Sequence, residues 1–225
     1  MLNEAGRLSH SVEDYLKAIH ALDARGETAS TSALAEMLDV QPSSVTGMVK
    51  RLAEWGLLAH VPYRGVHLTE SGRREALRVI RRHRIIETYL TDRLGYAWEE
   101  VHDEAERLEH AASDRLIAAM ADALGDPSHD PHGAPIPTEE GTIEASSFQS
   151  LADIPVGGRM EIRAVDDKGA PALRAMESIG LVPGVEVRVM DRMDDGAIAV
   201  GLGRSTKRRL VDRRLASLVY VAPVD

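Results

Sequence analysis

The sequence predicts an α+β protein with an N-terminal winged helix-turn-helix, a helical dimerisation domain and a C-terminal SH3-like small β-barrel. Three observations lead to this fold class. Apolar residues recur at helical spacing up to about residue 125, two short β-prone runs interrupt them near residue 60, and further β-prone runs separated by turn residues fill the C-terminal third. The boundaries that follow are 1–72 for the winged helix-turn-helix, 73–125 for the helical domain, 126–147 for a linker and 148–225 for the barrel.

The composition limits the class of protein. The chain has 225 residues with 44% hydrophobic content, which is enough for two or three small cores. It contains no cysteine, which excludes a disulfide framework and a thiolate zinc finger. The N-terminus lacks the pattern of a signal peptide, and no apolar run is long enough to span a bilayer. We therefore expect a soluble, cytoplasmic protein without a membrane partner.

The net charge of −9 is distributed unevenly along the chain. Residues 1–82 hold 11 Lys and Arg against 10 Asp and Glu, residues 83–145 hold 4 against 15, and residues 146–225 hold 12 against 11. The acidic excess therefore belongs to the middle segment. It suits a cation-binding domain, although a solvated acidic surface would have the same composition.

The first 72 residues have the pattern of a DNA-binding module. Helices are predicted over 11–24, with Ser11 as N-cap, over the stretch TSALAEML, and over 43–55, where Gly56 ends the helix. Two β-prone runs around a Pro-Tyr-Arg-Gly turn then predict the hairpin wing. In such a unit the second helix of the helix-turn-helix enters the major groove and nearby cations contact phosphate. The candidate DNA contacts are Gln41, Ser43, Ser44, Thr46, Lys50, Arg51 and, at the tip of the wing, Arg64.

Two helices are predicted in the middle segment, from Glu70 to Leu94 and from about Trp98 to Leu124. Each has an apolar stripe, and two helices alone bury such stripes poorly. Dimerisation would cover them.

The same helices carry histidine and carboxylate pairs at the spacing of one helical turn. His83 and Glu87 form one pair, His102 and Glu106 form another, and Glu109 and His110 extend the second group. Such pairs often lie on a solvated surface, but imidazole and carboxylate without sulfur also suit Mn(II) or Fe(II). The sequence thus offers a hard-ligand metal site next to a DNA-binding module.

Four stretches identify a family resemblance: SVEDYLKAI (11–19), RRHRIIETYLTD (81–92), VHDEAERLEH (101–110) and GAPIP (133–137). On these stretches the chain resembles the diphtheria-toxin-repressor family of metal-dependent transcriptional regulators, especially its manganese-sensing branch. The resemblance covers the winged helix and the dimerisation segment almost end to end. It implies a homodimer that binds an inverted-repeat operator in double-stranded DNA when metal is bound.

The resemblance also implies two groups of ligands. A primary, regulatory site would be built from Asp14, Glu106, Glu109 and His110, with His83 close by or shared. An ancillary site would use His83, Glu87 and His102. In the family this site is sometimes completed by groups from the C-terminal domain, for which Asp166 or Asp167 could substitute here.

The identity of two ligands favours manganese. The iron-sensing branch carries Met at the position of Asp14 and Cys at that of Glu106, and both are carboxylates here. Lys17 stands where some manganese sensors carry a carboxylate for a second ion, so the number of ions per subunit is left open.

The function predicted from these observations is a Mn(II)-activated repressor of metal-uptake genes that is not an enzyme and has no small organic substrate. Fe(II) is the alternative cofactor, and Co(II), Cd(II) or Zn(II) would act as surrogates. Two other classes stay open, a carboxylate-bridged metalloenzyme fused to a winged helix and a winged-helix regulator that needs no metal. We interpret the remaining histidines, His132 included, as non-ligands, and the Arg-rich run RSTKRRLVDRR as a solvated loop, although contact with DNA or another domain is an alternative.

Overall fold

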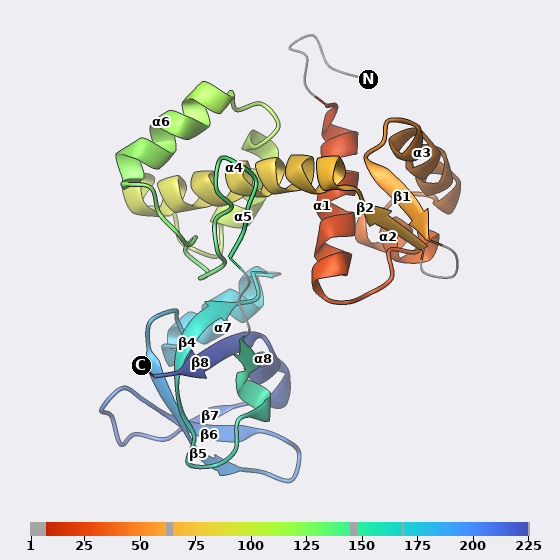
Figure 1. Cartoon of the computed structure of the whole chain (residues 1–225). Coiled ribbons are helices and arrows are strands. Elements are labelled where there is room, and N and C mark those ends of the chain that lie inside the picture. Colours follow the sequence, from red (N-terminus) through yellow and green to blue (C-terminus); the bar gives the residue numbers. More distant parts are fainter. Residues whose placement is uncertain (1–7, 62–64, 145–147, 168, 225) are drawn as a thin grey trace. The chain divides into compact units, whose positions relative to one another are not determined.

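The computed structural model describes residues 8–61, 65–144, 148–167 and 169–224 (Figure 1). The chain forms two compact units. Met1–Arg82 and Pro137–Ile143 make the first, and His83–Ile136 and Glu144–Asp225 make the second. Within the described part of the chain, no helix has both the length and the apolar character that crossing a membrane requires.

The first unit contains the elements of a winged helix in their expected order. Three helices, α1 (His10–Ala24), α2 (Thr31–Met37) and α3 (Pro42–Glu54), precede the antiparallel hairpin of β1 (Leu58–Val61) and β2 (Gly65–Leu68). The long helix α4 (Glu70–Leu94) follows. Val66 of β2 also forms a bridge with Ala29, where its N–H donates to the carbonyl oxygen at 3.4 Å. The predicted winged helix-turn-helix is therefore confirmed.

The helix starts of this unit differ from the prediction at one point. The N-cap of α1 is Ser9, whose backbone is extended, so Ser11 lies inside the first turn and is not the cap that we predicted. The N-cap of α2 is Ser30, whose hydroxyl accepts a hydrogen bond from the N–H of Ala33 at 3.1 Å. Helix α3 begins at Pro42, a residue favoured in the first helical turn because it lacks an N–H.

A buried ion pair joins the first and last helices of this unit. Nη1 of Arg82 on α4 lies 3.0 Å from Oε1 of Glu13 on α1, and both side chains are about 5% exposed. The apolar core around it is built from all three helices and the hairpin, with Leu16, Ile19, Leu34, Val45 and Leu52 completely or almost completely buried. This core and the ion pair fix α1 against the first half of α4.

The helical part of the second unit corrects the prediction of one helix over 98–124. The structure has two helices there, α5 (Val101–Leu108) and α6 (Asp114–Leu124). Ser113 is extended, and its hydroxyl accepts from the N–H of Leu116 at 3.2 Å, so a new helix begins at this cap. The prediction missed the break because the apolar stripe continues across it.

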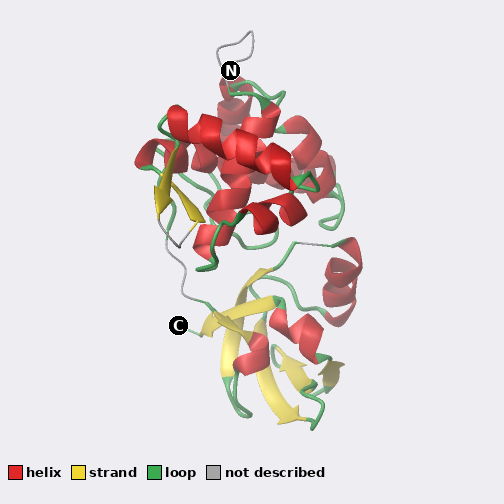
Figure 2. Ribbon diagram, turned by 90° about the vertical axis from the view of Figure 1, so that its right-hand side faces the viewer, coloured by secondary structure: helices red, strands yellow, loops and turns green. Residues whose placement is uncertain are grey.

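The C-terminal part of the second unit is a six-stranded antiparallel sheet with strand order β3-β8-β4-β5-β6-β7. Figure 2 shows the strands of this part in yellow and its short helices in red. Its strands are β3 (Gln149–Ser150), β4 (Arg159–Val165), β5 (Glu186–Arg192), β6 (Ile198–Leu202), β7 (Arg209–Val211) and β8 (Val219–Pro223). Helix α7 (Ala170–Ile179), the short helix α8 (Arg213–Ser217) and the 3-10 turn η1 (Leu151–Asp153) accompany the sheet. The β-prone runs predicted for the C-terminal third are strands of this sheet.

Part of the predicted linker is a folded segment of the second unit. Residues 126–136 form neither helix nor strand, yet Asp130, His132 and Ile136 are each less than 9% exposed. The carbonyl oxygen of His132 accepts a hydrogen bond from the N–H of Val165 on β4 at 2.9 Å. A Cβ atom on Gly133, which has φ +84°, would lie 2.0 Å from the carbonyl oxygen of Arg163. This segment therefore lies directly against β4, and only glycine fits at its closest approach.

Candidate metal centre

Helix α4 places two buried side chains that we predicted as ligands one turn apart. His83 is 6% exposed and Glu87 is completely buried. Nε2 of His83 lies 3.0 Å from Oε1 of Glu87, and its other ring nitrogen, Nδ1, lies 2.5 Å from Oε2 of Glu109. Because both nitrogens of one imidazole face carboxylates, His83 is the centre of this cluster.

Helix α5 and the turn after it carry further predicted ligands of the second unit. Nδ1 of His102 lies 3.2 Å from Nε2 of His83 and 3.4 Å from Oε1 of Glu87. Oε2 of Glu106 lies 3.6 Å from Nδ1 of His83. His110 follows in the turn, with its Nε2 3.6 Å from Oε1 of Glu109. His83, His102 and Glu106 each offer one ligand atom, and these three atoms lie within 4.8 Å of one another. This spacing would allow a single ion to bind all three.

The charge state of this cluster follows from its burial. Burial raises the pKa of Glu87, but hydrogen bonds from His102 and His83 lower it more, so its pKa lies well below the ordinary value. The hydrogen bond that His102 donates to Glu87 in turn raises the pKa of His102. Glu87 is therefore an anion at neutral pH inside the protein, where a charge requires a positive partner. In the metal-free protein, protonated imidazole is the positive partner of Glu87. A divalent cation would compete with the imidazole protons for the Glu87 carboxylate.

A second group of ligand atoms lies on the other side of Glu87. Oε2 of Glu87 lies 4.0 Å from Nδ1 of His132, and these two with Asp167 bring ligand atoms within 4.8 Å of one another. Oδ2 of Asp167 also lies 3.6 Å from Nδ1 of His102. We interpreted His132 as a non-ligand; the folded segment 126–136 places it beside Glu87 and Asp167, and whether it binds metal stays a prediction.

The orientation of His132 leaves a ring nitrogen available as a ligand. Its Nε2 lies 2.8 Å from the carbonyl oxygen of Trp98, to which it donates a hydrogen bond. In the neutral imidazole Nδ1 then carries the lone pair, and this nitrogen faces an oxygen of Glu87 that is buried and accepts no hydrogen bond from the described residues. Two acceptors facing each other in a buried site are unfavourable unless a proton or a metal cation lies between them. Histidines that bind metal almost always donate their other ring N–H, as Nε2 of His132 does here.

Neighbouring side chains hold the segment that presents His132. Oδ1 of Asp130 accepts hydrogen bonds from the N–H groups of His132 and Ala134, both at 2.9 Å. Nε of Arg84 lies 3.4 Å from Oδ2 of Asp130, and the Arg84 guanidinium also donates to the carbonyl oxygen of Pro135. Burial, together with the charge of Glu87, raises the pKa of Asp130 to about 6. Arg84, which follows His83 on α4, thus fixes the loop to this helix.

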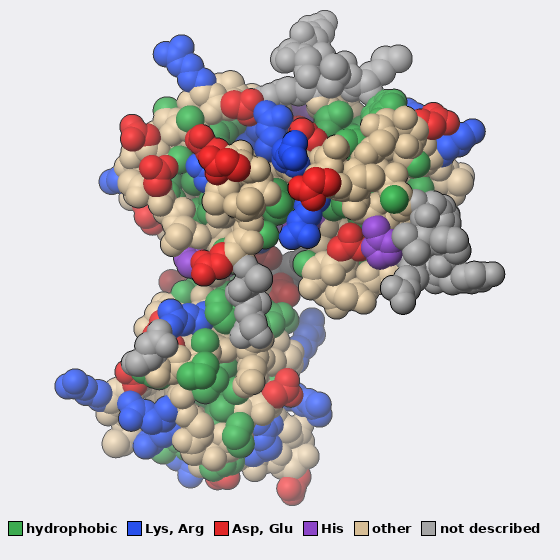
Figure 3. Space-filling model, viewed as in Figure 1, with side chains coloured by type: hydrophobic (Ala, Val, Ile, Leu, Met, Phe, Trp, Pro, Cys, Tyr) green, Lys and Arg blue, Asp and Glu red, His purple; other side chains and the backbone are tan. Residues whose placement is uncertain are grey.

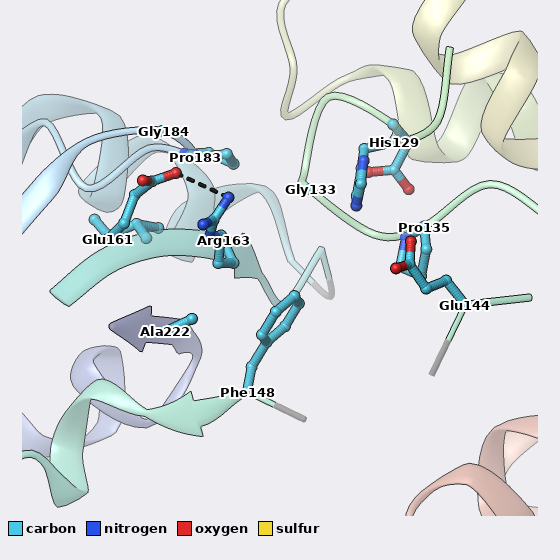
Figure 4. Close-up of a pocket in the computed structure, with 12 residues that line it drawn as sticks. His129, Gly133, Pro135, Glu144, Phe148, Glu161, Arg163, Pro183, Gly184 and Ala222 are labelled. Carbon is cyan, nitrogen blue, oxygen red and sulfur yellow. Dashed lines mark ion pairs between the residues drawn. The ribbon is translucent and has the colours of Figure 1, made fainter. Parts of the chain in front are cut away.

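A cavity of about 440 Å³ lies beside this loop (Figure 4). His129, Gly133 and Pro135 line one side, and Phe148 and the side chains of the Glu161–Arg163 ion pair, whose atoms are 3.2 Å apart, line the other. None of the predicted metal ligands lines it. The cavity is therefore separate from the ligand cluster.

Asp14 lies on α1 in the first unit and is partly buried. The other predicted ligands all belong to the second unit. The predicted joining of Asp14 to Glu106, Glu109 and His110 would link the two units and stays a prediction.

Helix α3 presents the predicted DNA-contact side chains to solvent. Its inward positions Val45, Met48 and Leu52 are buried. The predicted contacts on α3 and its N-cap are all exposed: Gln41, Ser43, Ser44, Thr46, Lys50 and Arg51. The hydroxyl of Thr46 donates to the carbonyl oxygen of Pro42 at 3.1 Å, so it is already engaged within the helix. Arg64 lies outside the described residues.

A winged helix, a second unit that gathers histidine and carboxylate ligands, and an antiparallel β-domain together define a metal-dependent DNA-binding regulator. Comparison with known families agrees with this class. Residues 7–66 match the N-terminal DNA-binding domain of iron-dependent repressors, residues 69–138 match their metal-binding and dimerisation domain, and residues 149–223 match the FeoA domain.

Individual relatives extend this match over the whole chain. The diphtheria toxin repressor of Corynebacterium glutamicum is 30% identical over 228 residues, which cover 97% of this chain and 98% of the relative. The iron-dependent repressor IdeR of Mycobacterium tuberculosis is 35% identical over 163 residues, which cover 69% of this chain and 70% of the relative. The chain belongs to the diphtheria-toxin-repressor family, as the sequence predicted.

Solved structures show the same similarity in three dimensions. A manganese-dependent transcriptional repressor in complex with manganese has a TM-score of 0.87 and 37% identity, and the match covers 95% of this chain and all of that one. ScaR with bound Zn²⁺ has a TM-score of 0.79 and 29% identity, over 95% of this chain and 99% of that one. The chain is thus a metal-dependent DNA-binding repressor with a dimerisation domain, and the fold class predicted from its sequence is confirmed.

Proposed function

We propose that this repressor is activated by Mn(II) and controls genes for metal uptake. The observation that carries the proposal is the buried, sulfur-free ligand set around His83 and Glu87. Carboxylate and imidazole ligands suit Mn(II) and Fe(II), and a site without sulfur favours the harder ion. The similarity to a manganese-dependent repressor supports the same choice. Fe(II) is the alternative, supported by the relatives named as iron-dependent repressors, and Co(II), Cd(II) or Zn(II) would serve as surrogates.

We assign the ligands to two adjacent centres. The primary centre uses Asp14, Glu106, Glu109 and His110, with His83 close by or shared. The ancillary centre uses His83, Glu87 and His102, and we add His132 and Asp167 to it because their ligand atoms lie on the far side of Glu87. The number of ions per subunit is left to measurement.

The bound ion supplies positive charge that neutralises converging carboxylates and gives them a common partner. Without it, Glu106 and Glu109 of the second unit would repel Asp14 of the first, which disfavours arrangements that bring these side chains together. An ion that binds one arrangement better than the others raises the population of that arrangement. The favoured form would be a homodimer whose two α3 helices enter successive major grooves of an inverted-repeat operator.

Exposed apolar side chains of the helical segment support the homodimer. Leu94, Leu108 and Leu116 are 58%, 39% and 46% exposed, and all three lie in the second unit.

We propose the boundaries 1–72, 73–125, 126–147 and 148–225 for the domains, with residues 126–136 packed as described. A cytoplasmic location follows from the DNA target. We propose neither a catalytic activity nor a small organic substrate or a membrane partner. Oxygen consumption or hydrolysis by the Mn(II)- or Fe(II)-loaded protein would contradict this part.

A DNA-binding titration tests the choice of metal. Wild type and Glu106→Cys are titrated with Mn(II), Fe(II), Co(II) and Zn(II) in the presence of a DNA fragment selected by the metal-loaded protein. If the oxygen ligand sets the preference, the wild type responds best to Mn(II) among the two physiological candidates and the variant shifts toward Fe(II). An unchanged ranking would remove the basis for manganese and leave metal-dependent repression intact.

A further inference from the structure

The C-terminal domain carries a dense group of cations that the metal centre does not use. Residues 204–214 contain six basic side chains and one acidic one, Asp212. The rest of residues 146–225 holds six basic residues against ten acidic ones, so half of the positive charge lies in these eleven positions. We call residues 204–214 the basic segment. Its basic members are Arg204, Lys207, Arg208, Arg209, Arg213 and Arg214.

The basic segment follows one edge of the sheet. It covers the connection after β6, the edge strand β7 and the start of α8. Five of its six basic side chains are exposed, and Arg209 is partly buried. On the face shown in Figure 3, Lys and Arg side chains are spread over the β-domain, and a group of Asp and Glu side chains lies on the helical part of the molecule.

Nearby carboxylates neutralise little of this charge. Nη2 of Arg208 lies 2.6 Å from Oδ2 of Asp191, but both side chains are 54% exposed, where an ion pair is weak. Asp212 is engaged as the N-cap of α8, since its Oδ1 accepts from the N–H of Leu215 at 2.9 Å. Among the described residues, Arg204 and Lys207 form no ion pair. The segment is therefore a net positive surface in a chain of charge −9.

Protection of a sheet edge explains only part of this pattern. Charged residues on an edge strand discourage pairing with another strand, and β7 with its exposed Leu210 is such an edge. However, β7 has three residues, and only Arg209 of the six cations lies in it. The cations before and after β7 need another reason, because like charges repel one another without a partner.

We propose that the basic segment binds the phosphate backbone of DNA in the repressor–DNA complex, independently of base sequence. The partner of this protein is a polyanion, and guanidinium groups suit phosphate. The recognition helix offers only Lys50 and Arg51 as cations among its predicted contacts. Additional phosphate contacts from the C-terminal domain would add affinity without altering which sequence is recognised.

The salt dependence of DNA binding tests this proposal on the full-length, Mn(II)-loaded protein. The test variant is Arg204→Gln/Lys207→Gln. The matched control is Arg159→Gln/Arg174→Gln, which removes the same charge from exposed positions of the same domain outside the segment. A Lys50→Gln/Arg51→Gln variant reports on the winged helix. Binding to a duplex of mixed sequence is measured by fluorescence anisotropy over a range of salt concentrations.

Each lost phosphate contact lowers the slope of log K against log salt by about 0.9. We expect the slope of the test variant to be smaller than that of the wild type by up to about 1.8 per subunit, and the matched control to keep the wild-type slope. All variants should still need Mn(II) to bind DNA. A test variant with the wild-type slope, beside a winged-helix variant with a reduced one, would overturn the proposal while leaving DNA binding by α3 intact. An unchanged slope with altered dimer dissociation would overturn it in favour of a contact between subunits.

Discussion

Replacement of Glu87 by glutamine should remove most of the stabilisation that metal binding at the ancillary centre gives to the protein. Glu87 is completely buried, its Oε1 lies 3.0 Å from His83 and 3.4 Å from His102, and its Oε2 faces His132. Gln has the same shape, so the substitution removes the anionic ligand without opening a cavity. Loss of a group that merely orients a metal ligand lowers affinity about 10- to 100-fold, and loss of a charged ligand should reach at least the upper value.

The size of the effect follows from mass action. At a free Mn(II) concentration about 100 times the wild-type Kd, binding stabilises the folded protein by about 2.7 kcal/mol. If the Kd of Glu87→Gln is about 100-fold higher, the same concentration stabilises it by only about 0.4 kcal/mol. For a protein of this size, the difference corresponds to about 5–9 °C in the metal-induced rise of Tm.

Calorimetric titration and thermal unfolding with and without Mn(II) measure both quantities. Glu100→Gln, which changes an exposed glutamate of the same unit, is the control and should retain the wild-type rise in Tm. If Glu87→Gln bound Mn(II) with unchanged affinity and unchanged stoichiometry, the buried cluster around Glu87 would not be the ancillary metal centre.

Four further predictions concern other parts of the structure. His132→Gln should lower Mn(II) affinity at least about 10-fold in calorimetric titration while His129→Gln, on the same loop, leaves it unchanged, and equal affinities would return His132 to a purely structural role. Arg82→Ala should cost about 3–5 kcal/mol of unfolding free energy in urea denaturation because it leaves Glu13 buried and charged, and Arg82→Met/Glu13→Leu should recover much of this loss. Gly133→Ala should destabilise the protein more than Gly157→Ala, since both have positive φ but only the first has a backbone oxygen in the way, and similar urea midpoints would contradict the close packing on β4. Mn(II) affinity should fall as pH falls through the raised pKa of His102, because a proton then competes with the metal for the imidazole. The stability of the metal-free protein should change in the opposite direction, because the His102–Glu87 pair contributes at low pH and its contribution is lost as pH rises through the same pKa. A Mn(II) affinity that does not depend on pH would contradict the assignment of His102.

The sequence predicted the elements whose determinants are local. The apolar periodicity of α1 and α3, the turn residues of the hairpin and the alternating strands of the β-domain all correspond to elements of the structure. The pairs His83–Glu87 and His102–Glu106 also converge, because helical spacing alone places each pair on one face. Local errors arose where two signals competed. At Ser113 the apolar stripe continues, but the serine hydroxyl caps the start of a new helix.

The sequence did not predict the position of His132 beside Glu87, because that position depends on long-range packing. A segment rich in proline, glycine and acid has the composition of a linker, and only its hydrogen bonds to β4 and Arg84 make it part of the second unit. The turn chemistry contained a usable signal, since Asp130 two residues before His132 and Gly133 directly after it are typical of a tight, specified loop. Which ring nitrogen faces Glu87 depends on the carbonyl of Trp98, 34 residues away in the chain.

The most direct test of the account is the affinity of the wild-type protein for a selected DNA fragment, measured on one preparation saturated with Mn(II), stripped with a chelator and then reloaded. We expect tight binding in the saturated sample, weak binding after chelation and full recovery on reloading. Equal affinity for DNA in all three states would contradict the claim that an ion bound by the His83–Glu87 cluster and the neighbouring ligands controls DNA binding.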